Sequence, residues 1–86
     1  MSAHQPASQT ERAVAGIWRD VLDLPSVGAG DNFFDLGGHS MLLHVVQQRI
    51  ASDLGRDIPV TELFEFPTIR ALARHLDAAD RAEVTP

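Results

Sequence analysis

The hydrophobic residues near the beginning of the chain recur at the spacing of one face of a helix. They are Val14, Ile17, Trp18, Val21 and Leu22, at offsets i, i+3, i+4, i+7 and i+8. Ser8 and Glu11 stand before them at the spacing of a capping box, in which both side chains bond backbone groups of the first turn. Pro25 cannot continue a helix, because it has no N–H group to donate. The pattern predicts an amphipathic helix that begins after Ser8 and is stopped by Pro25.

A second helical stripe follows Ser40. Its apolar members cluster on one side of a helical wheel, and they are Leu43, Val46, Ile50 and Leu54. Gly55 comes next and suits the left-handed residue that ends many helices. The pattern predicts a helix over residues 40–54 with this stripe in the core. Met41 and Val45 then neighbour each other on the outer face, with Ser40 and Leu42 on the two flanks.

The second half of the chain predicts two further helices. A short helical turn is expected over residues 61–66, after the break at Pro59. The last helix is expected to start near Thr68 and to run towards residues 77–80, with a core stripe of Ile69, Leu72, Ala73 and Leu76. No segment alternates apolar and polar residues convincingly, as a strand does. We therefore expect an all-α fold, a small bundle of three main helices plus one short helix.

A long loop over residues 23–38 separates the first two predicted helices. Loops of this length are uncommon in compact domains unless they are functional or packed against the rest. Phe33, Phe34 and Leu36 suggest packing, because aromatic side chains can pin a loop onto helices. Residues 1–7 are expected to be a flexible lead-in and residues 81–86 a tail or linker stub, which leaves residues 8–80 as the domain.

Size and charge narrow the classes of function. A chain of 86 residues forms one small domain, which favours a binding, carrier or regulatory module over an autonomous enzyme with a deep cleft. Its net charge is −5, and all seven basic residues are arginines, without the basic patch that nucleic acid binding requires. The acidic surface serves solubility or docks onto a basic partner. With no cysteine, no membrane-spanning run and no signal peptide, a cytoplasmic monomer without nucleic acid or membrane partners is expected.

The most informative segment is residues 31–40, with the sequence DNFFDLGGHS. It combines two aromatic residues, two glycines and a serine at the predicted start of a helix. Ser40 has two interpretations. It is only an N-cap, whose oxygen accepts a hydrogen bond from the first turn, or its exposed hydroxyl is a site of modification. Gly37 and Gly38 merely allow the chain to turn, or they keep bulk away from an approaching enzyme.

Hydrolysis and metal binding do not fit this segment. His39 is adjacent to Ser40, a spacing that rarely brings imidazole and hydroxyl into hydrogen-bonding register, and no G-x-S-x-G elbow is present. The four histidines show no His-x-x-x-His pair, and cysteine is absent. We therefore expect neither catalytic residues nor a metal site.

Residues 31–40 resemble the cofactor-attachment motif of peptidyl carrier (thiolation) domains from nonribosomal peptide synthetases, in the acyl-carrier-like superfamily. Two later segments resemble the same family. Residues 54–60, LGRDIPV, are similar to its connection between the second and third helices. Residues 61–69, TELFEFPTI, are similar to its short third helix and the start of its fourth. The three segments occur in the family's order, and the resemblance covers most of the chain.

This resemblance implies a non-catalytic carrier domain over residues 8–80. Ser40 would carry 4′-phosphopantetheine covalently, with Gly37, Gly38 and His39 beside the attachment point. A phosphopantetheinyl transferase would supply the group from coenzyme A, and the arm would then hold an aminoacyl or peptidyl thioester. The implied partners are adenylation, condensation, thioesterase or tailoring domains. The phosphodiester would lie at the positive end of the second helix.

The outer face of the second helix is the expected docking surface, formed by Met41, Leu42, His44 and Val45. Residues 40–52 contain no acid and a single base, Arg49, which favours apolar over ionic docking. Acyl carriers of polyketide or fatty-acid pathways resemble this chain less, because they show Asp-Ser-Leu where this chain has His-Ser-Met. An acyl carrier remains the alternative within the superfamily. Outside it, the alternative is an unmodified helical module that binds a partner through the same face.

Overall fold

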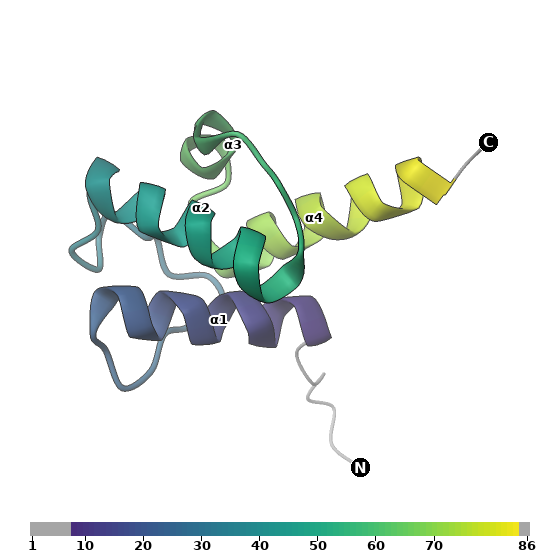
Figure 1. Cartoon of the computed structure of the whole chain (residues 1–86). Coiled ribbons are helices and arrows are strands. Elements are labelled where there is room, and N and C mark those ends of the chain that lie inside the picture. The colour runs from purple at the N-terminus through teal and green to yellow at the C-terminus, as the bar shows by residue number, and fades with distance from the viewer. Residues whose placement is uncertain (1–7, 85–86) are drawn as a thin grey trace, which may run out of the picture.

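The computed structural model describes residues 8–84, which form four helices (Figure 1). They are α1 (Gln9–Leu22), α2 (Ser40–Leu54), α3 (Val60–Glu65) and α4 (Ile69–Val84). The only β-type pairing in this range is an isolated antiparallel bridge between Asn32 and Thr68. The expected all-α bundle of three main helices and one short helix is therefore confirmed.

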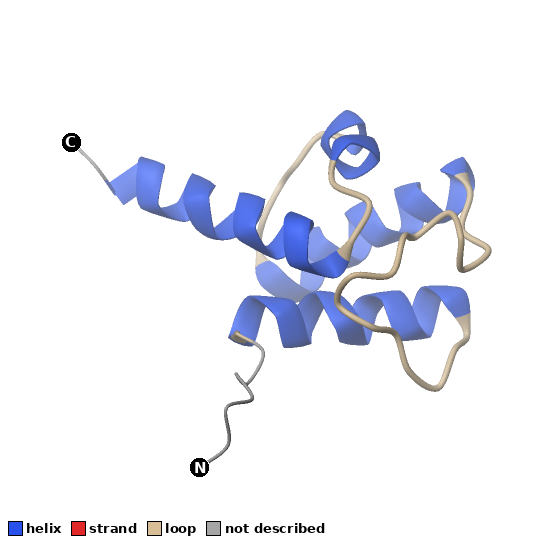
Figure 2. Ribbon diagram, turned by 180° about the vertical axis from the view of Figure 1, so that it is seen from behind, coloured by secondary structure: helices blue, strands red, loops and turns tan. Residues whose placement is uncertain are grey.

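Helices α1 and α2 lie side by side in opposite directions, and α4 crosses them on one face, which is the far side in Figure 1 and the near side in Figure 2. Helix α3 packs beside α2 on the side away from α1, and the far end of α4 projects beyond the other helices. The long connection between α1 and α2 runs across one end of the bundle. The loop thus lies between the end of α1 and the start of α2 (Figure 2).

Both ends of α1 are fixed by local hydrogen bonds. At its start, the Ser8 hydroxyl accepts a hydrogen bond from the Glu11 amide at 3.0 Å, which is one of the two bonds of the capping box that the spacing predicts. At its end, Asp23 adopts the left-handed conformation with φ of 57°, and the Leu24 amide bonds the Arg19 carbonyl. The helix therefore ends at Leu22, two residues earlier than an ending at Pro25 requires. Asp23, rather than the proline, closes it.

The core lies where the three long helices meet. In α2, the predicted stripe is buried at Leu43, Val46 and Ile50, while Leu54 is half-buried against the cluster. The largest fully buried side chains are Trp18, Phe33, Leu43, Ile50, Leu63, Ile69, Leu72 and Leu76. Each such side chain contributes roughly 1.5–3 kcal/mol by leaving water, before the entropy cost of ordering is subtracted. Phe33 is the loop's contribution to this core.

The last two helices differ from expectation mainly at the end of α4. Helix α3 is displaced by one residue from the expected 61–66, and α4 begins next to Thr68, whose hydroxyl accepts a hydrogen bond from the Ala71 amide. An ending of α4 at residues 77–80 was wrong, because the helix continues to Val84. No Gly or Pro interrupts residues 69–84, so the helix has no local reason to stop. The expected lead-in over residues 1–7 lies outside the described residues.

Candidate functional site: a serine at the start of α2

Ser40 is the first residue of α2, as predicted, and its side chain is exposed. Within the described part of the chain, its hydroxyl makes no hydrogen bond. The N-cap position belongs to His39, which has an extended backbone and no side-chain capping bond. The interpretation of Ser40 as an N-cap is therefore wrong, because the helix begins one residue earlier than that role requires. The hydroxyl is free to react.

The start of α2 has the electrostatic character of an anion site. The first amides of a helix have no partner within the helix, and the dipole places partial positive charge there. The first turn of α2 contains no acidic residue. These groups suit a phosphodiester on the Ser40 oxygen, whose negative charge would lie beside the unpaired amides. The residues present thus fit a phosphopantetheine group.

The loop before Ser40 is tied to the rest of the domain by its backbone. The Phe33 amide bonds the Pro67 carbonyl at 2.8 Å, and the Arg70 amide bonds the Ala29 carbonyl at 3.0 Å. Inside the loop, the side-chain oxygen of Asn32 accepts hydrogen bonds from the amides of Phe34 and Asp35. The loop is therefore a folded segment whose end delivers the chain to Ser40.

The two glycines before Ser40 serve different purposes. Gly37 has a φ of 103°, which side chains of L-residues rarely adopt, and a Cβ there would meet nothing within 4 Å. At Gly38, a Cβ would lie 2.2 Å from a ring carbon of Phe33 and 2.8 Å from its carbonyl oxygen. Gly37 is thus required by backbone conformation and leaves open space. Gly38 is required by close packing inside the loop.

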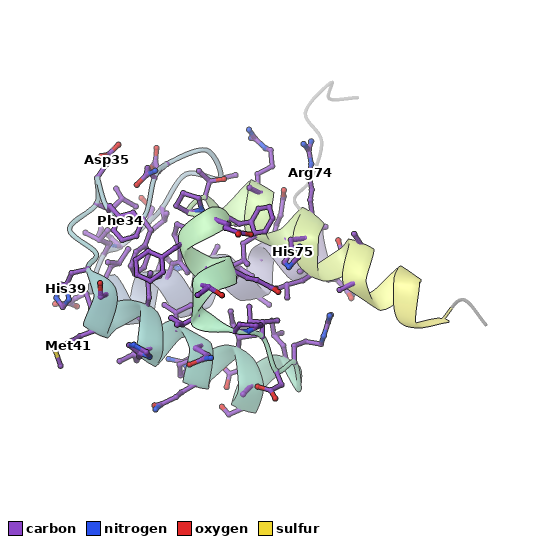
Figure 3. All side chains as sticks on the ribbon, turned by 90° about the horizontal axis from the view of Figure 1, so that it is seen from above. Phe34, Asp35, His39, Met41, Arg74 and His75 are labelled. Atoms are coloured by element: carbon purple, nitrogen blue, oxygen red, sulfur yellow. The ribbon has the colours of Figure 1, made fainter. Side chains whose placement is uncertain are left out.

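The predicted docking residues on α2 differ in exposure. Met41 is 74% exposed and Val45 is 42% exposed, as expected for the outer face. His44 is also exposed. Leu42 is half-buried and packs against the core, so only part of its side chain faces solvent. Figure 3 shows Met41 and His39 projecting from the same end of α2.

Two further phenylalanines are exposed, and the sequence did not reveal them as surface residues. Phe34 is 37% exposed and Phe64, on α3, is 45% exposed. Their rings stack with centroids 5.8 Å apart and an interplanar angle of 19°. Phe34 (Figure 3) thus holds the loop against α3 at the surface, whereas Phe33 is fully buried in the core. The spacing of Phe33 and Phe34 in an irregular loop does not tell which ring is buried.

The opposite end of α2 carries a cluster of charged side chains. Arg49 bonds Asp53 one turn later at 3.0 Å and Asp20 of α1 at 3.3 Å. The hydrogen bond from Arg49, with a second from Ser52, lowers the pKa of Asp53. The bonds to Asp53 and Asp20 in turn raise the pKa of Arg49. This cluster joins α1 to α2 at the surface.

Among residues 8–84, no three His, Cys, Asp or Glu side chains lie together as metal ligands would. None of the described helices is both long enough and apolar enough to cross a membrane.

A family model described as "Phosphopantetheine attachment site" matches residues 12–76, which is most of the chain. The chain belongs to this family of carrier domains. The carrier role, the non-catalytic character and the covalent phosphopantetheine cofactor expected from the sequence are therefore confirmed for the family to which it belongs.

Two relatives are peptide synthetases much longer than this chain. The chain is 46% identical over 72 residues to surfactin synthase subunit 1 of Bacillus subtilis (strain 168), a match that covers 84% of the chain. It is 41% identical over 80 residues to tyrocidine synthase 3 of Brevibacillus parabrevis, a match that covers 93% of the chain. The matched region is 2% of the length of the first relative and 1% of the second. The similarity therefore concerns one carrier segment of each of these proteins.

Solved structures share the fold of this carrier domain. One is a peptidyl carrier protein in complex with the phosphopantetheine transferase Sfp and coenzyme A, with a TM-score of 0.79 and 34% identity over 85% of this chain and 95% of that one. Another is McyG A-PCP complexed with phenylalanyl-adenylate, with a TM-score of 0.78 and 45% identity over 85% of this chain and 12% of that one. The acyl-carrier-like fold expected from the sequence is confirmed.

Proposed function

We propose that this chain is a peptidyl carrier (thiolation) domain of a nonribosomal peptide synthetase and that Ser40 is its attachment residue. The observation that carries the proposal is the exposed Ser40 hydroxyl, free of hydrogen bonds in the described part of the chain, at the first position of α2. It directly follows Gly37, Gly38 and His39, inside the segment that matches the phosphopantetheine attachment family. Relatives among peptide synthetases favour a peptidyl over an acyl carrier.

The attachment reaction asks little of the carrier itself. The Ser40 oxygen attacks the phosphorus that bears pantetheine in coenzyme A, and a new oxygen–phosphorus bond forms. The bond to adenosine 3′,5′-bisphosphate breaks, and the hydroxyl proton passes to a base of the transferase. No base of this chain is needed. The exposed hydroxyl and the open space beside Gly37 leave room for the transferase to reach Ser40.

The bound arm supplies a thiol on which an aminoacyl or peptidyl group is held as a thioester. Ser40 fixes the root of that arm to a rigid helix, so the cargo stays within reach of each partner at high effective concentration. Coenzyme A and the aminoacyl-adenylates that load such carriers are cytoplasmic metabolites. We place the domain in the cytoplasm on that ground.

The docking face consists of Met41, Val45 and His44 on α2 and the exposed part of Leu42. Its partners would be the transferase and the adenylation, condensation, thioesterase or tailoring domains. An apolar face made of a few side chains supports modest, short-lived interfaces, which let the carrier leave one partner for the next. Met41 adapts easily to differently shaped partner surfaces.

Intact-mass measurement tests the proposal. The purified chain is incubated with coenzyme A, Mg²⁺ and a broad-specificity phosphopantetheinyl transferase. We expect the wild type to gain the mass of one phosphopantetheinyl group and Ser40→Ala to gain nothing. Ser52→Ala, which removes another exposed serine of α2, is the matched control and should be modified fully.

Absence of any mass gain in a folded wild-type sample would contradict the carrier role. It would leave the unmodified interaction module, which should still bind its partner as Ser40→Ala. Modification of Ser40→Ala would place the attachment on another residue.

A further inference from the structure

Phe33 is anchored more firmly than any other residue of the loop that leads to Ser40. Its ring is fully buried and meets the Trp18 ring edge-on, with centroids 4.9 Å apart. Its amide donates to the Pro67 carbonyl at 2.8 Å, next to the bridge between Asn32 and Thr68. Phe33 is thereby fixed to α1 through its ring and to the segment before α4 through its backbone.

The chain just before Ser40 folds back onto this anchored residue. The amide of Gly38 donates to the Phe33 carbonyl at 3.0 Å, and the amide of Leu36 reaches the same oxygen at 3.2 Å. A Cβ at Gly38 would fall 2.2 and 2.3 Å from two carbons of the Phe33 ring. The backbone at Gly38 therefore rests directly on the ring and the carbonyl of Phe33, two residues before Ser40.

Ser40 has no comparable anchor of its own. Its side chain is exposed, and His39 provides no side-chain cap for the first turn of α2. An uncapped first turn frays easily, because its amides gain little by staying helical. The first buried side chain of the helix is Leu43, one turn further along. The position of Ser40 thus depends on the buried Leu43, which follows it in the chain, and on the contact between Gly38, which precedes it, and Phe33.

We propose that Phe33 is a positioning residue for phosphopantetheine attachment: it fixes the backbone at Gly38 and so sets the position at which the Ser40 hydroxyl is presented. This inference rests on the proposed function of Ser40. Phe33 touches neither coenzyme A nor the reacting atoms, since its ring is sealed in the core. It acts through the geometry of residues 38–40. Displacement of a reacting group by about 1 Å can reduce a rate by two orders of magnitude.

The test compares Phe33→Leu with a core variant of equal stability at the other end of the domain. Leu76 is fully buried, and its carbonyl accepts a hydrogen bond from Arg56, which follows the C-terminal end of α2. That end lies about 22 Å from Ser40 along a helix of 15 residues. Leu76→Val or Leu76→Ala, whichever matches the unfolding midpoint of Phe33→Leu, is the control.

Transfer from coenzyme A by the transferase is followed at a temperature where both variants are folded. For Phe33→Leu we expect kcat to fall about tenfold with KM within about twofold of wild type, because the docking residues are unchanged. Amide hydrogen exchange should become faster at residues 38–42. The Leu76 control should keep wild-type kcat. Gly38→Ala, which disturbs the same contact from the other side, should lower kcat in the same way and serves if Phe33→Leu does not fold.

Three results would overturn the inference. Transfer to Phe33→Leu at the wild-type rate would show that Ser40 does not depend on it. Equal slowing in the Leu76 control would reduce the effect to stability. A raised KM with unchanged kcat would assign Phe33 to docking. Failure of the wild type to accept the group is a separate outcome, which would refute the proposed function and not the positioning alone.

Discussion

The two ends of α2 are built in opposite ways. At the C-terminal end, Arg49 bonds Asp53 and Asp20. In the middle of the helix, the side chain of Gln47 donates to the Ile58 carbonyl at 2.8 Å. The backbone at the C-terminal end is closed by Gly55, whose amide bonds the Ala51 carbonyl. Polar groups at this end have partners within the domain.

At the N-terminal end, in the described part of the chain, Ser40 makes no hydrogen bond and His39 makes no capping bond. Met41 beside them is mostly exposed. This end is instead fixed by contacts with the core, through the buried Leu43 and through Gly38, which packs against the buried Phe33. The difference shows how α2 can be rigid and still present a reactive group. The contacts that fix the N-terminal end of α2 are buried, so the outer surface of the helix stays accessible to other proteins.

The largest effect on phosphopantetheine transfer should come from placing a charge at the N-terminal end of α2. Met41→Asp should reduce kcat/KM for phosphopantetheine transfer about tenfold, equivalent to ~1.4 kcal/mol, because a charge would be desolvated against an apolar partner. Stability should change by less than about 0.5 kcal/mol, since Met41 is 74% exposed. Ala51→Asp places the same charge near the C-terminal end of α2 and should leave the rate of transfer unchanged. Equal rates for the two variants would argue against a docking role for the N-terminal end.

A smaller effect separates the two serines that stand at helix starts. Ser8 caps α1 by accepting the Glu11 amide, so Ser8→Ala should lower the free energy of unfolding by about 1 kcal/mol. Ser40 caps nothing, and Ser40→Ala should change the same quantity by less than about 0.5 kcal/mol. Urea denaturation of the two variants measures both values. A cost at Ser40 as large as that at Ser8 would mean that its hydroxyl supports the helix.

The smallest effect is the pH dependence of stability that arises from Asp53 at the C-terminal end of α2. Arg49 and Ser52 hold the pKa of Asp53 below its ordinary value of about 3.9 in the folded chain. The carboxylate therefore stabilises the fold above that ordinary value, and the contribution is lost as the pH falls through the lower, folded pKa. Asp53→Asn should be less stable than wild type at pH 7, and the difference should vanish in strong acid.

Arg49→Gln provides the control for this pH effect. In that background, Asp53→Asn should cause a much smaller pH-dependent change in the free energy of unfolding, because the main partner that lowers the pKa of Asp53 is gone and only the hydrogen bond from Ser52 remains. A difference between Asp53→Asn and wild type that stays constant down to strong acid would contradict the assigned cause.

The regular spacing of apolar residues predicted most of the helices correctly. The exact helix ends could not always be predicted in this way. The stripe of α2 gave the buried face and both helix ends, because one period governs 15 residues. The end of α4 was misplaced, since only the absence of Gly and Pro indicated that the helix continues to Val84. The N-cap of α2 is His39, so one of the two interpretations of Ser40 was wrong, although the helix does start at Ser40. Helix ends depend on backbone angles that neighbouring residue types do not specify.

At the site, the sequence indicated Ser40 and the exposed pair Met41 and Val45, because motif and wheel agreed. The sequence did not show that Phe33 is buried and Phe34 exposed. That difference depends on the contact of Phe33 with Trp18 and of Phe34 with Phe64, both of which are distant in the chain. The sequence also did not assign separate roles to the two successive glycines, Gly37 and Gly38. Only the structure shows that one meets a backbone requirement and the other a packing requirement. Contacts between distant segments are not encoded in local spacing.

The central claim is that the phosphopantetheinyl group is carried on Ser40. Proteolysis of the transferase-treated wild type, followed by fragmentation mass spectrometry, locates the added group directly. The account predicts that the added mass lies on Ser40 and nowhere else in the chain. An added group on another serine or threonine, or an unmodified Ser40 in a folded sample, would contradict it.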